Sequence, residues 1–152
     1  MEIKQVSVEI CENRKQDIAK IIFNSMNFGC DVYWYSIAEA LVKCDELKQY
    51  IELENAIAFI AIEKNEINGF IWAYPYPDRN DENRVYISIV YVNENCRDAS
   101  VGKYLVKAVE EAAKRKGYKK VWLHTSGANF GARKFYEKIG FEQERIQYIK
   151  KI

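Results

Sequence analysis

The spacing of apolar residues changes twice in the first third of the chain. Glu2 to Ile10 alternates between polar and apolar side chains, which predicts a half-buried strand. Apolar residues at helical spacing then predict one helix from Asn13 to about Met26 and another from about Tyr33 to Tyr50. This part of the chain is therefore expected to fold as a strand followed by two helices.

Three β-prone runs come next. Ala56 to Glu63 and Ile67 to Tyr76 are separated by residues suited to a tight turn, and Arg84 to Val92 follows a polar, acidic loop. Runs that lie so close together in the sequence are expected to pair with their neighbours as an antiparallel meander.

Helix and strand patterns alternate in the last third of the chain. A periodic apolar stripe predicts a helix from Val101 to Ala113, Lys120 to Thr125 predicts a strand, and Asn129 to Ile139 predicts a further helix. Phe141 to Ile152 predicts a final strand, or two strands with a bend.

The resulting order, β-α-α-β-β-β-α-β-α-β, predicts an α/β fold with one central mixed sheet, mostly antiparallel, and helices on both faces. The strand, helix and strand between Arg84 and Thr125 are expected to form a parallel crossover unit. No linker or repeat divides the sequence, so residues 1–152 are expected to form a single domain.

Composition narrows the class of partner. Charged residues make up 30% of the chain but nearly cancel to a net charge of +1, which argues against nucleic acid or an anionic membrane. The four cysteines are too widely spaced for a redox pair or a zinc site, so no metal is expected. The chain shows neither a signal-peptide pattern nor an apolar run of about 18 residues, which predicts a cytoplasmic protein.

The turn from Arg97 to Gly102 is a candidate phosphate site. It leads into the N-terminus of the periodic helix, where unpaired amides and the positive end of the helix dipole favour an anion. Its small residues allow close approach, and Arg97 adds a positive charge. An ordinary strand-to-helix turn with a cap fits the same residues equally well.

Asn129 and Tyr136 lie seven residues apart, near one face of the last predicted helix. Asn129 suits an N-cap, and packing against the sheet is the more common role of a helical tyrosine. A phenol with a pKa of about 10 can also protonate a departing thiolate, whose thiol has a pKa of about 8.5.

In the order of these motifs the chain resembles the GNAT superfamily of N-acetyltransferases. That superfamily carries an Arg/Gln-x-x-Gly-x-Gly/Ala turn after a splayed strand and, one strand later, Asn-x-x-Ala/Ser-x-x-x-Tyr-Glu-x-x-Gly-Phe. The first motif corresponds here to Arg97-Asp98-Ala99-Ser100-Val101-Gly102, with serine at a position where glycine is usual. The second corresponds to Asn129, Ala132, Tyr136-Glu137 and Gly140-Phe141.

The resemblance implies a role for each motif. Acetyl-CoA is the expected cosubstrate, its pyrophosphate held by the turn amides of Arg97, Asp98, Ala99, Ser100, Val101 and Gly102. Its pantetheine arm is expected to pair with the backbone of Val90, Tyr91 and Val92. Asn129 is expected near the thioester, and Tyr136 is expected to protonate the CoA thiolate as acetyl passes directly to an amine.

The sequence indicates the base that deprotonates the amine less clearly than it indicates the cofactor site. Arg84 to Val92 contains no carboxylate, which serves as the base on this strand in some relatives. His124, the only histidine, lies in a Leu-His-Thr sequence similar to that of some N-terminal-amine acetyltransferases, and histidine titrates near neutrality. The alternative is a hydrogen-bonded histidine on the far face of the sheet, with bulk water serving as the base.

Aromatic and acidic residues are expected to surround the acceptor. Aromatic walls with a nearby carboxylate suit a cationic amine, although core packing and a solvated loop explain the same residues. The aromatic residues are Phe28, Tyr33, Trp34 and Tyr35, then Trp72, Tyr74 and Tyr76, and the acidic ones are Asp78, Asp81 and Glu82.

The sequence therefore predicts transfer of acetyl from acetyl-CoA to a primary amine, with a small molecule favoured because the chain carries no docking extension. A protein N-terminal or lysine acetyltransferase and a non-catalytic acyl-CoA-binding regulatory module are the alternatives. A sheet edge at the C-terminal strands also predicts a homodimer.

Overall fold

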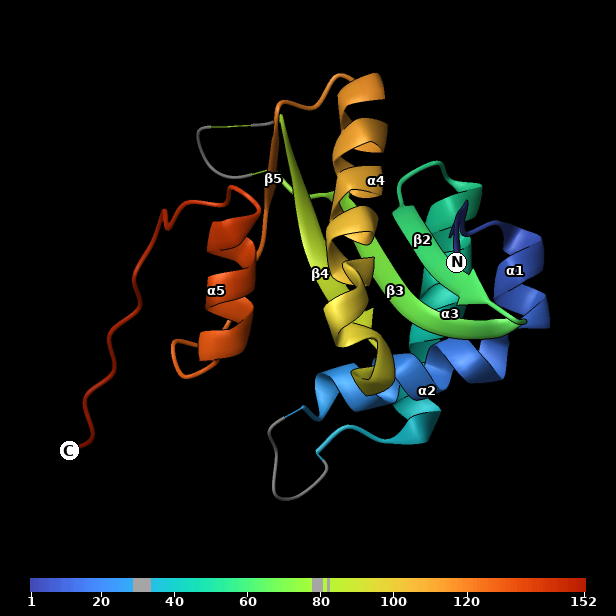
Figure 1. The fold of residues 1–152 in the computed structure, drawn as a ribbon, viewed down its shortest axis with the longest axis horizontal. Helices are drawn as coiled ribbons and strands as arrows, with labels where there is room; N and C mark the ends of the chain where they lie inside the picture. Colours follow the sequence, from blue (N-terminus) through green and yellow to red (C-terminus); the bar gives the residue numbers. More distant parts are fainter. Residues whose placement is uncertain (29–33, 78–80, 82) are drawn as a thin grey trace.

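The computed structural model describes residues 1–28, 34–77, 81 and 83–152, without the side chains of residues 98 and 99. Within this part, five strands form one sheet in the order β1-β2-β3-β4-β5 (Figure 1). The strands are β1 (Glu2–Gln5), β2 (Ile57–Glu63), β3 (Glu66–Pro75), β4 (Arg84–Val92) and β5 (Lys120–Trp122). The helices are α1 (Val8–Asn13), α2 (Lys15–Met26), α3 (Ile37–Glu52), α4 (Val101–Arg115) and α5 (Phe130–Lys138), with a 3-10 helix at Glu94–Ala99.

Strand pairing follows the predicted topology. β1, β2, β3 and β4 pair in succession as antiparallel neighbours, and β4 pairs with β5 in parallel. The meander and the parallel crossover are therefore confirmed. The parallel pairing is short, because it joins only Arg84–Tyr86 to Lys120–Trp122.

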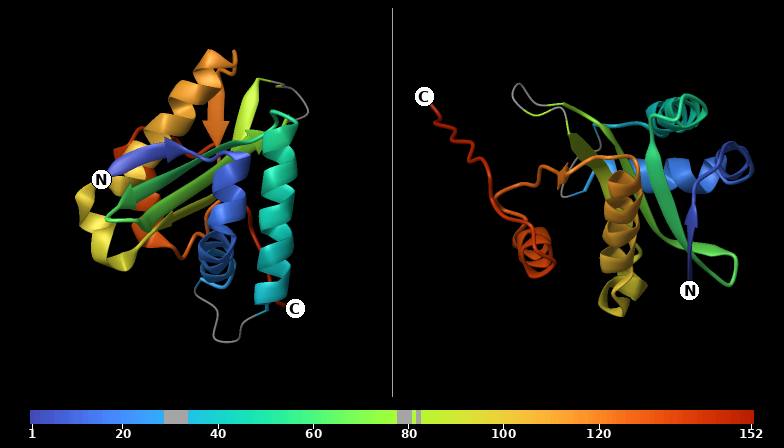
Figure 2. Two further views of the ribbon diagram at one scale, coloured as in Figure 1. Left: turned by 90° about the vertical axis from the view of Figure 1, so that its right-hand side faces the viewer. Right: turned by 90° about the horizontal axis from the view of Figure 1, so that it is seen from above.

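Helices cover both faces of the sheet, as predicted (Figure 2). On one face, α1, α2 and α3 bury a core around Phe70 and Trp72. On the other face, α4 packs over Ile71 and Val85, and its own Val101, Leu105 and Val109 are fully buried. Alternate residues of the central strands thus supply two separate cores, as expected for a sheet buried on both sides. Among the described residues, no helix has both the length and the hydropathy that crossing a membrane requires.

The start of α3 is fixed by a reciprocal cap. The Ser36 hydroxyl accepts from the amide of Glu39 at 3.2 Å, and the Glu39 carboxylate accepts from the amide of Ser36 at 2.7 Å. This capping box begins the helix at Ile37 rather than near Tyr33, which lies outside the described residues. Burial of Asn27, whose side-chain amide donates to the Tyr35 carbonyl at 2.8 Å, ties the end of α2 to the approach to α3.

The prediction that the first strand reaches Ile10 is wrong. β1 ends at Gln5, and the side chain of Ser7 accepts from the amide of Ile10 to start α1. Apolar residues at 6, 8 and 10 fit a strand, but the addition of Cys11 at helical spacing lets the same segment bury one face as a helix. The Ser7 cap decides between the two periods.

The predicted final strand is also wrong. Residues 141–152 are in no strand, and the segment leads away from the body of the molecule beyond α5 (Figure 1). β-propensity alone does not hold a strand, because its backbone groups require a neighbouring strand to bond. β5, the edge strand, is only three residues long in this structure.

Gly69 is required by the close approach of α4 to β3. A Cβ at this position would lie 2.8 Å from both Leu105 Cδ1 and Val101 Cγ1. We expect Gly69→Ala to lower the free energy of unfolding by about 1–3 kcal/mol, because both neighbours are fully buried. Urea unfolding followed by tryptophan fluorescence gives the change as a shift in midpoint.

Gly127→Ala is the matched control for this prediction. A Cβ there would meet nothing within 4 Å, so the expected change stays within about 0.5 kcal/mol. Equal losses in the two variants would contradict the role of Gly69 in helix–sheet packing.

Candidate active site

β4 and β5 pair along only part of the length of β4. Their pairing ends at Tyr86 and Trp122, whereas β4 continues to Val92 with β3 on its other side. Among the described residues, the edge of β4 that carries Val90, Tyr91 and Val92 therefore has no strand partner on the β5 side. A chain with backbone-like amide and carbonyl groups, as in pantetheine, is suited to pair with such an edge.

The turn after β4 is a 3-10 helix with its own side-chain support. The Asn93 side chain accepts from the amide of Asn95 at 3.2 Å, and the amide of Asn93 donates to the Asn68 carbonyl at 2.8 Å. Arg97 and Glu94 form an ion pair at 3.4 Å in which both side chains are exposed. An exposed pair of this kind is weak, so the guanidinium is available to an anion.

Ser100 adopts the left-handed conformation, with φ 60° and ψ 13°, at the junction between the turn and α4. Ser100 is the N-cap residue of α4, but its side chain makes no capping hydrogen bond. Glycine is the usual residue in this conformation, because a Cβ crowds the backbone.

The first turn of α4 contains amides that have no hydrogen-bond acceptor within the helix. The bond from Tyr104 N to Ser100 O, at 3.1 Å, is the first of the helix, so the amides of Val101, Gly102 and Lys103 precede it. They lie next to the end of β4, where the positive end of the helix dipole favours an anion. Arg97 to Gly102 therefore has the chemistry of a phosphate site.

Gly102 has a packing role as well. A Cβ at this position would lie 3.0 Å from Phe135 Cζ, and Gly102 is buried. The missing side chain thus lets α5 approach the first turn of α4, and so brings the second motif close to the first.

Asn129 and Tyr136 sit on α5 as predicted from their spacing. The Asn129 side chain caps the helix by accepting from the amide of Ala132 at 3.1 Å. Tyr136 packs edge-on against Phe135 and Phe141, with ring centroids 5.2 Å and 5.5 Å away. Burial raises the pKa of the Tyr136 phenol to about 12, so it stays protonated at neutral pH.

His124 lies elsewhere, beyond the end of β5, and is exposed. Its ring is 5.0 Å from Trp122 and 5.8 Å from Tyr86. The two predicted catalytic residues thus belong to different clusters, one beside α5 and one on the sheet.

Seven rings form a continuous row, here called the aromatic track, across α3, β3, β4 and β5. Neighbouring ring centroids are 4.8–6.3 Å apart. The track consists of Tyr50, Trp72, Tyr74, Tyr76, Tyr86, Trp122 and His124. Trp72 is buried in the core, whereas Tyr50, Tyr76 and His124 are exposed, so the track combines core packing with an accessible aromatic wall.

A β-bulge interrupts β4 beside this track. Trp72 is opposite Ile89 and Ala73 is opposite Ile87, which leaves Ser88 as the extra residue. Ser88 is exposed although it lies in the middle of β4, which has a strand neighbour on each side along part of its length, so the sheet is uncovered at this point. Burial raises the pKa of Tyr74, and a side-chain hydrogen bond with Ser88 opposes that shift.

Asp81, the one predicted acidic residue of the acceptor site that the structure describes, already forms ion pairs within the protein. Asp81 pairs with Lys120 at 2.5 Å and with Arg84 at 3.5 Å, and Lys120 together with the Asn83 amide lowers its pKa. Asp78, Glu82 and Tyr33 lie outside the described residues. Phe28 and Trp34 are exposed, whereas Tyr35 is buried in the core.

Cys11 and Cys44 are poor nucleophiles. Burial raises the pKa of Cys11 to about 11 and that of Cys44 to about 12. Both side chains lie in the core under α1, α2 and α3. These two thiols are therefore protonated and enclosed, so neither is suited to carry an acyl group.

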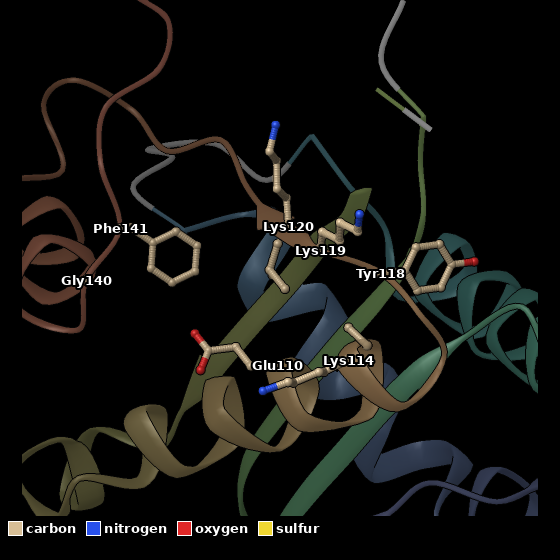
Figure 3. Close-up of a pocket in the computed structure, with 9 residues that line it drawn as sticks. Glu110, Lys114, Tyr118, Lys119, Lys120, Gly140 and Phe141 are labelled. Carbon is tan, nitrogen blue, oxygen red and sulfur yellow. The ribbon is translucent and has the colours of Figure 1, made fainter. Parts of the chain in front are cut away.

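The surface also carries two hollows of similar volume. One, of about 530 Å³, lies between α2 and the β2–β3 turn and is bordered by Tyr91 and Asn93. The other, of about 520 Å³, lies between the C-terminal end of α4, β5 and Phe141 (Figure 3).

Sequence reasoning missed Tyr50, Tyr86, Ser88 and Trp122 in the neighbourhood of the site. Tyr86 and Trp122 alternate with apolar residues in runs that had been assigned only to packing. Their shared face follows from the register of β4 with β5, and the exposure of Ser88 follows from the bulge. The alternation of apolar and aromatic residues in each run could have predicted that Tyr86 and Trp122 face one side of the sheet. No local sequence signal could have predicted the bulge at Ser88.

Known proteins match both the sequence and this fold. A family model described as "Acetyltransferase (GNAT) family" matches residues 24–141. The probable N-acetyltransferase camello of Xenopus tropicalis is 26% identical over 125 residues, or 80% of this chain and 56% of the relative. The uncharacterized N-acetyltransferase YhfO of Bacillus subtilis (strain 168) is 31% identical over 99 residues, or 64% and 66% of the two. The chain spans about half the length of the curated relatives it matches.

A solved structure with the same fold is that of AAC(6')-Iy in complex with the bisubstrate analog CoA-S-monomethyl-acetylneamine. Its TM-score is 0.75 at 22% sequence identity, and the match covers 99% of this chain and 97% of that one. This likeness confirms the predicted fold class.

The backbone of Ser100 gives a test of the turn. We expect Ser100→Gly to raise the free energy of unfolding by up to about 1 kcal/mol, because relief of the left-handed strain outweighs the added entropy of the unfolded chain. Ser36→Gly is the matched control, since Ser36 has φ −85° and caps α3 with its side chain. Chemical denaturation is expected to show a loss of a few tenths of a kcal/mol there. A loss for Ser100→Gly as large as that of the control would contradict the strain.

Proposed function

Because the chain belongs to the GNAT family of acetyltransferases, we propose that it transfers acetyl from acetyl-CoA to a primary amine of a small molecule. Residues 1–152 act together as one acetyltransferase domain in this proposal. The observation that carries it is the edge of β4 that is unpaired beyond Tyr86 and leads, at Val92, to the first turn of α4. That arrangement offers an unpaired strand edge and a helix N-terminus, which together suit an amide-bearing arm ending in a phosphate.

The described residues fit acetyl-CoA. The amides of Val101, Gly102 and Lys103 and the exposed Arg97 suit its pyrophosphate. The edge of β4 at Val90, Tyr91 and Val92 suits its pantetheine arm, and Asn129 is assigned to the neighbourhood of the thioester. When bound, the thioester supplies the acetyl group and a thiolate leaving group. Ser100 leaves its amide available but keeps a Cβ next to the pyrophosphate position.

Tyr136 is the proposed donor to the departing sulfur. A phenol with a pKa of about 12 is a weaker acid than a thiol with a pKa of about 8.5, and complete proton transfer would be uphill by about 5 kcal/mol. Tyr136 therefore acts first as a hydrogen-bond donor that stabilises the developing thiolate charge. Its high pKa guarantees that the donor is protonated before every turnover.

His124 is the proposed base for the amine. It lies at the exposed end of the aromatic track, where solvent can carry the proton away from it. Its position beside Trp122 also places it on the face that carries Ser88 and Tyr86. Water acting through the exposed surface at Ser88 is the competing route.

The aromatic track is the proposed wall of the acceptor site. Its exposed rings suit the face of a ring or the charge of an ammonium group, and each such contact contributes about 0.5–1.5 kcal/mol. The solved complex of AAC(6')-Iy holds a bisubstrate analog built on an aminoglycoside derivative, which supports a small-molecule amine as the acceptor class. A cytoplasmic location and a homodimer stay predictions.

A cofactor and acceptor assay tests the proposal. We expect acetyl-CoA to bind in calorimetry and CoA thiol to be released with a panel of ring-bearing and aliphatic primary amines. Turnover of peptides with free N-termini or lysines but of no small amine would favour a protein acetyltransferase. Tight binding without turnover of any acceptor would favour the regulatory module, and absence of binding would exclude both.

Tyr136→Phe is expected to lower turnover by about 10–100-fold while the affinity for acetyl-CoA stays nearly unchanged, because only the donor is removed. The wild type should show no loss of rate from Tyr136 between pH 7 and pH 10, since its phenol loses its proton only near pH 12. Tyr104→Phe, an exposed tyrosine of α4, is the control. Equal rates for Tyr136→Phe and the control would remove Tyr136 from the mechanism.

His124→Gln is expected to abolish the acidic limb of the pH–rate profile of the acceptor step, because the substituted amide cannot accept the proton. The measurement is the rate of thiol release against pH at saturating acetyl-CoA. A profile that keeps the wild-type shape would assign the base to solvent.

A further inference from the structure

One face of α3 borders the aromatic track with a stripe of three polar side chains. Lys43, Glu46 and Tyr50 follow one another at intervals of three and four residues, which places them on the same face of the helix. The Tyr50 ring stacks on Tyr74 with a centroid distance of 6.0 Å and lies 6.2 Å from Trp72. This face of α3 is therefore turned toward the track, and Lys43 lies about two helical turns from Tyr50 along it.

Lys43 brings a positive charge to the edge of the track. Its Nζ donates to the Glu46 carboxylate at 2.5 Å, and the two side chains are 41% and 39% exposed. Glu46 is the only hydrogen-bond partner of Lys43 among the residues that the structure describes, so further donors of the ammonium group stay available to a ligand. A pair exposed to this degree opens at little cost, because solvent screens it.

The charge of Lys43 reaches the Tyr74 phenol. Burial raises the pKa of Tyr74, and both a hydrogen bond with Ser88 and the Lys43 ammonium oppose this rise. The hydrogen bond with Glu46 raises the pKa of Lys43, and Tyr74 adds to that effect. Lys43 is therefore positively charged at neutral pH and acts on the middle of the track.

Tyr74 joins this charge to the place proposed for the reaction. Its hydroxyl shares a hydrogen bond with Ser88, which is exposed at the bulge of β4. Two residues further along, β4 reaches Val90, on the edge that is proposed for the pantetheine arm. A substrate that lies on the Tyr74 ring is thus within reach of both Ser88 and the ammonium of Lys43.

The carboxylates in this neighbourhood do not match the effect of Lys43. Asp81 pairs with Lys120 at 2.5 Å, and Glu46 is held by Lys43 itself. Among the described residues, no carboxylate affects the pKa of Tyr74 as strongly as the Lys43 ammonium does. The charge that meets a substrate on Tyr74 is therefore positive, which favours an acceptor with a negatively charged group.

We propose that the acceptor amine also carries a carboxylate, and that Lys43 binds this carboxylate beside the aromatic track. The proposal rests on the function proposed above, because it assigns the acceptor to the same wall. The ring or apolar body of the acceptor lies on Tyr74 and Tyr50, its amine is directed toward Ser88, and its carboxylate accepts from Lys43 Nζ. Lys43 is thus a specificity-determining residue that selects amino acids over amines without an acid group.

Matched pairs of acceptors test this selectivity. Phenylalanine is compared with phenethylamine, and para-aminomethylbenzoate with benzylamine, as kcat/KM for thiol release from acetyl-CoA. The wild type is expected to prefer the acid over its counterpart in at least one pair. Lys43→Met, which keeps the length and the helix propensity of the side chain, should lower that preference by about 10-fold or more, the size expected for one hydrogen bond between charged groups. Comparing the two proteins on the same pair removes the intrinsic reactivity of the amines.

Lys48→Met is the matched control. Lys48 belongs to the same helix and its Nζ donates to Glu12 at 2.5 Å, but its spacing from Lys43 places it on another face. This substitution should leave the preference for acids at the wild-type value. Glu46→Gln removes the partner of Lys43 and keeps the ammonium, so the preference for acids should persist in that variant.

A binding measurement decides the proposal even without turnover. Hydrocinnamate has the carboxylate of phenylalanine but no amine, and hydrocinnamyl alcohol is its uncharged counterpart. In calorimetry, hydrocinnamate should bind the wild type about 10-fold more tightly than the alcohol, and Lys43→Met should remove the difference. Absence of turnover with every amine, while this difference persists, would contradict the proposed function but support the anion site.

Three results would overturn the proposal. The first is a wild type that favours the acid in neither pair and binds hydrocinnamate no better than the alcohol. The second is a preference for acids that is the same in the wild type and in Lys43→Met. The third is a preference for para-xylylenediamine over benzylamine that Glu46→Gln abolishes, which would assign the stripe to a second cationic group.

Discussion

The short pairing of β4 with β5 is the constraint on which the rest of the structure depends. Three residues of each strand are joined at Arg84–Tyr86 and Lys120–Trp122, and from there the strands separate. Beyond this point β4 remains a strand, because β3 pairs with it as far as Val92. The opening between the two strands is therefore bordered by the paired strand β4, and it leads along β4 toward the first turn of α4.

The positions of α4 and α5 beside the opening follow from how these helices pack against their neighbours. α4 is held against β3 by the absence of a side chain at Gly69, and α5 approaches α4 because Gly102 leaves room for Phe135. The two motifs thus meet because two glycines leave room for neighbouring side chains, and Gly102 also offers its amide to the proposed phosphate site. Burial of the Tyr136 phenol follows from the same packing of α5.

The opening also separates the two sides of the reaction. One side has the helix N-terminus and the free edge of β4, which are polar and suited to a phosphate-bearing arm. The other has the aromatic track, with the uncovered bulge at Ser88 in the middle of the sheet. In the proposed function the acetyl donor would use the first surface and the amine acceptor the second, so the two would not compete for the same residues.

The sequence by itself determined the periodic elements, the two motifs and the position of Ser100, because apolar spacing and glycine-like turns act over a few residues. It correctly placed Asn129 as a helix cap and β4 between two turns. Only the tertiary structure decided the length of the β4–β5 pairing, the bulge at Ser88 and the burial of Tyr136. Each of these depends on partners far away in the chain. The 142–152 segment makes the same point, since strand propensity is local but the neighbouring strand that would satisfy it is not.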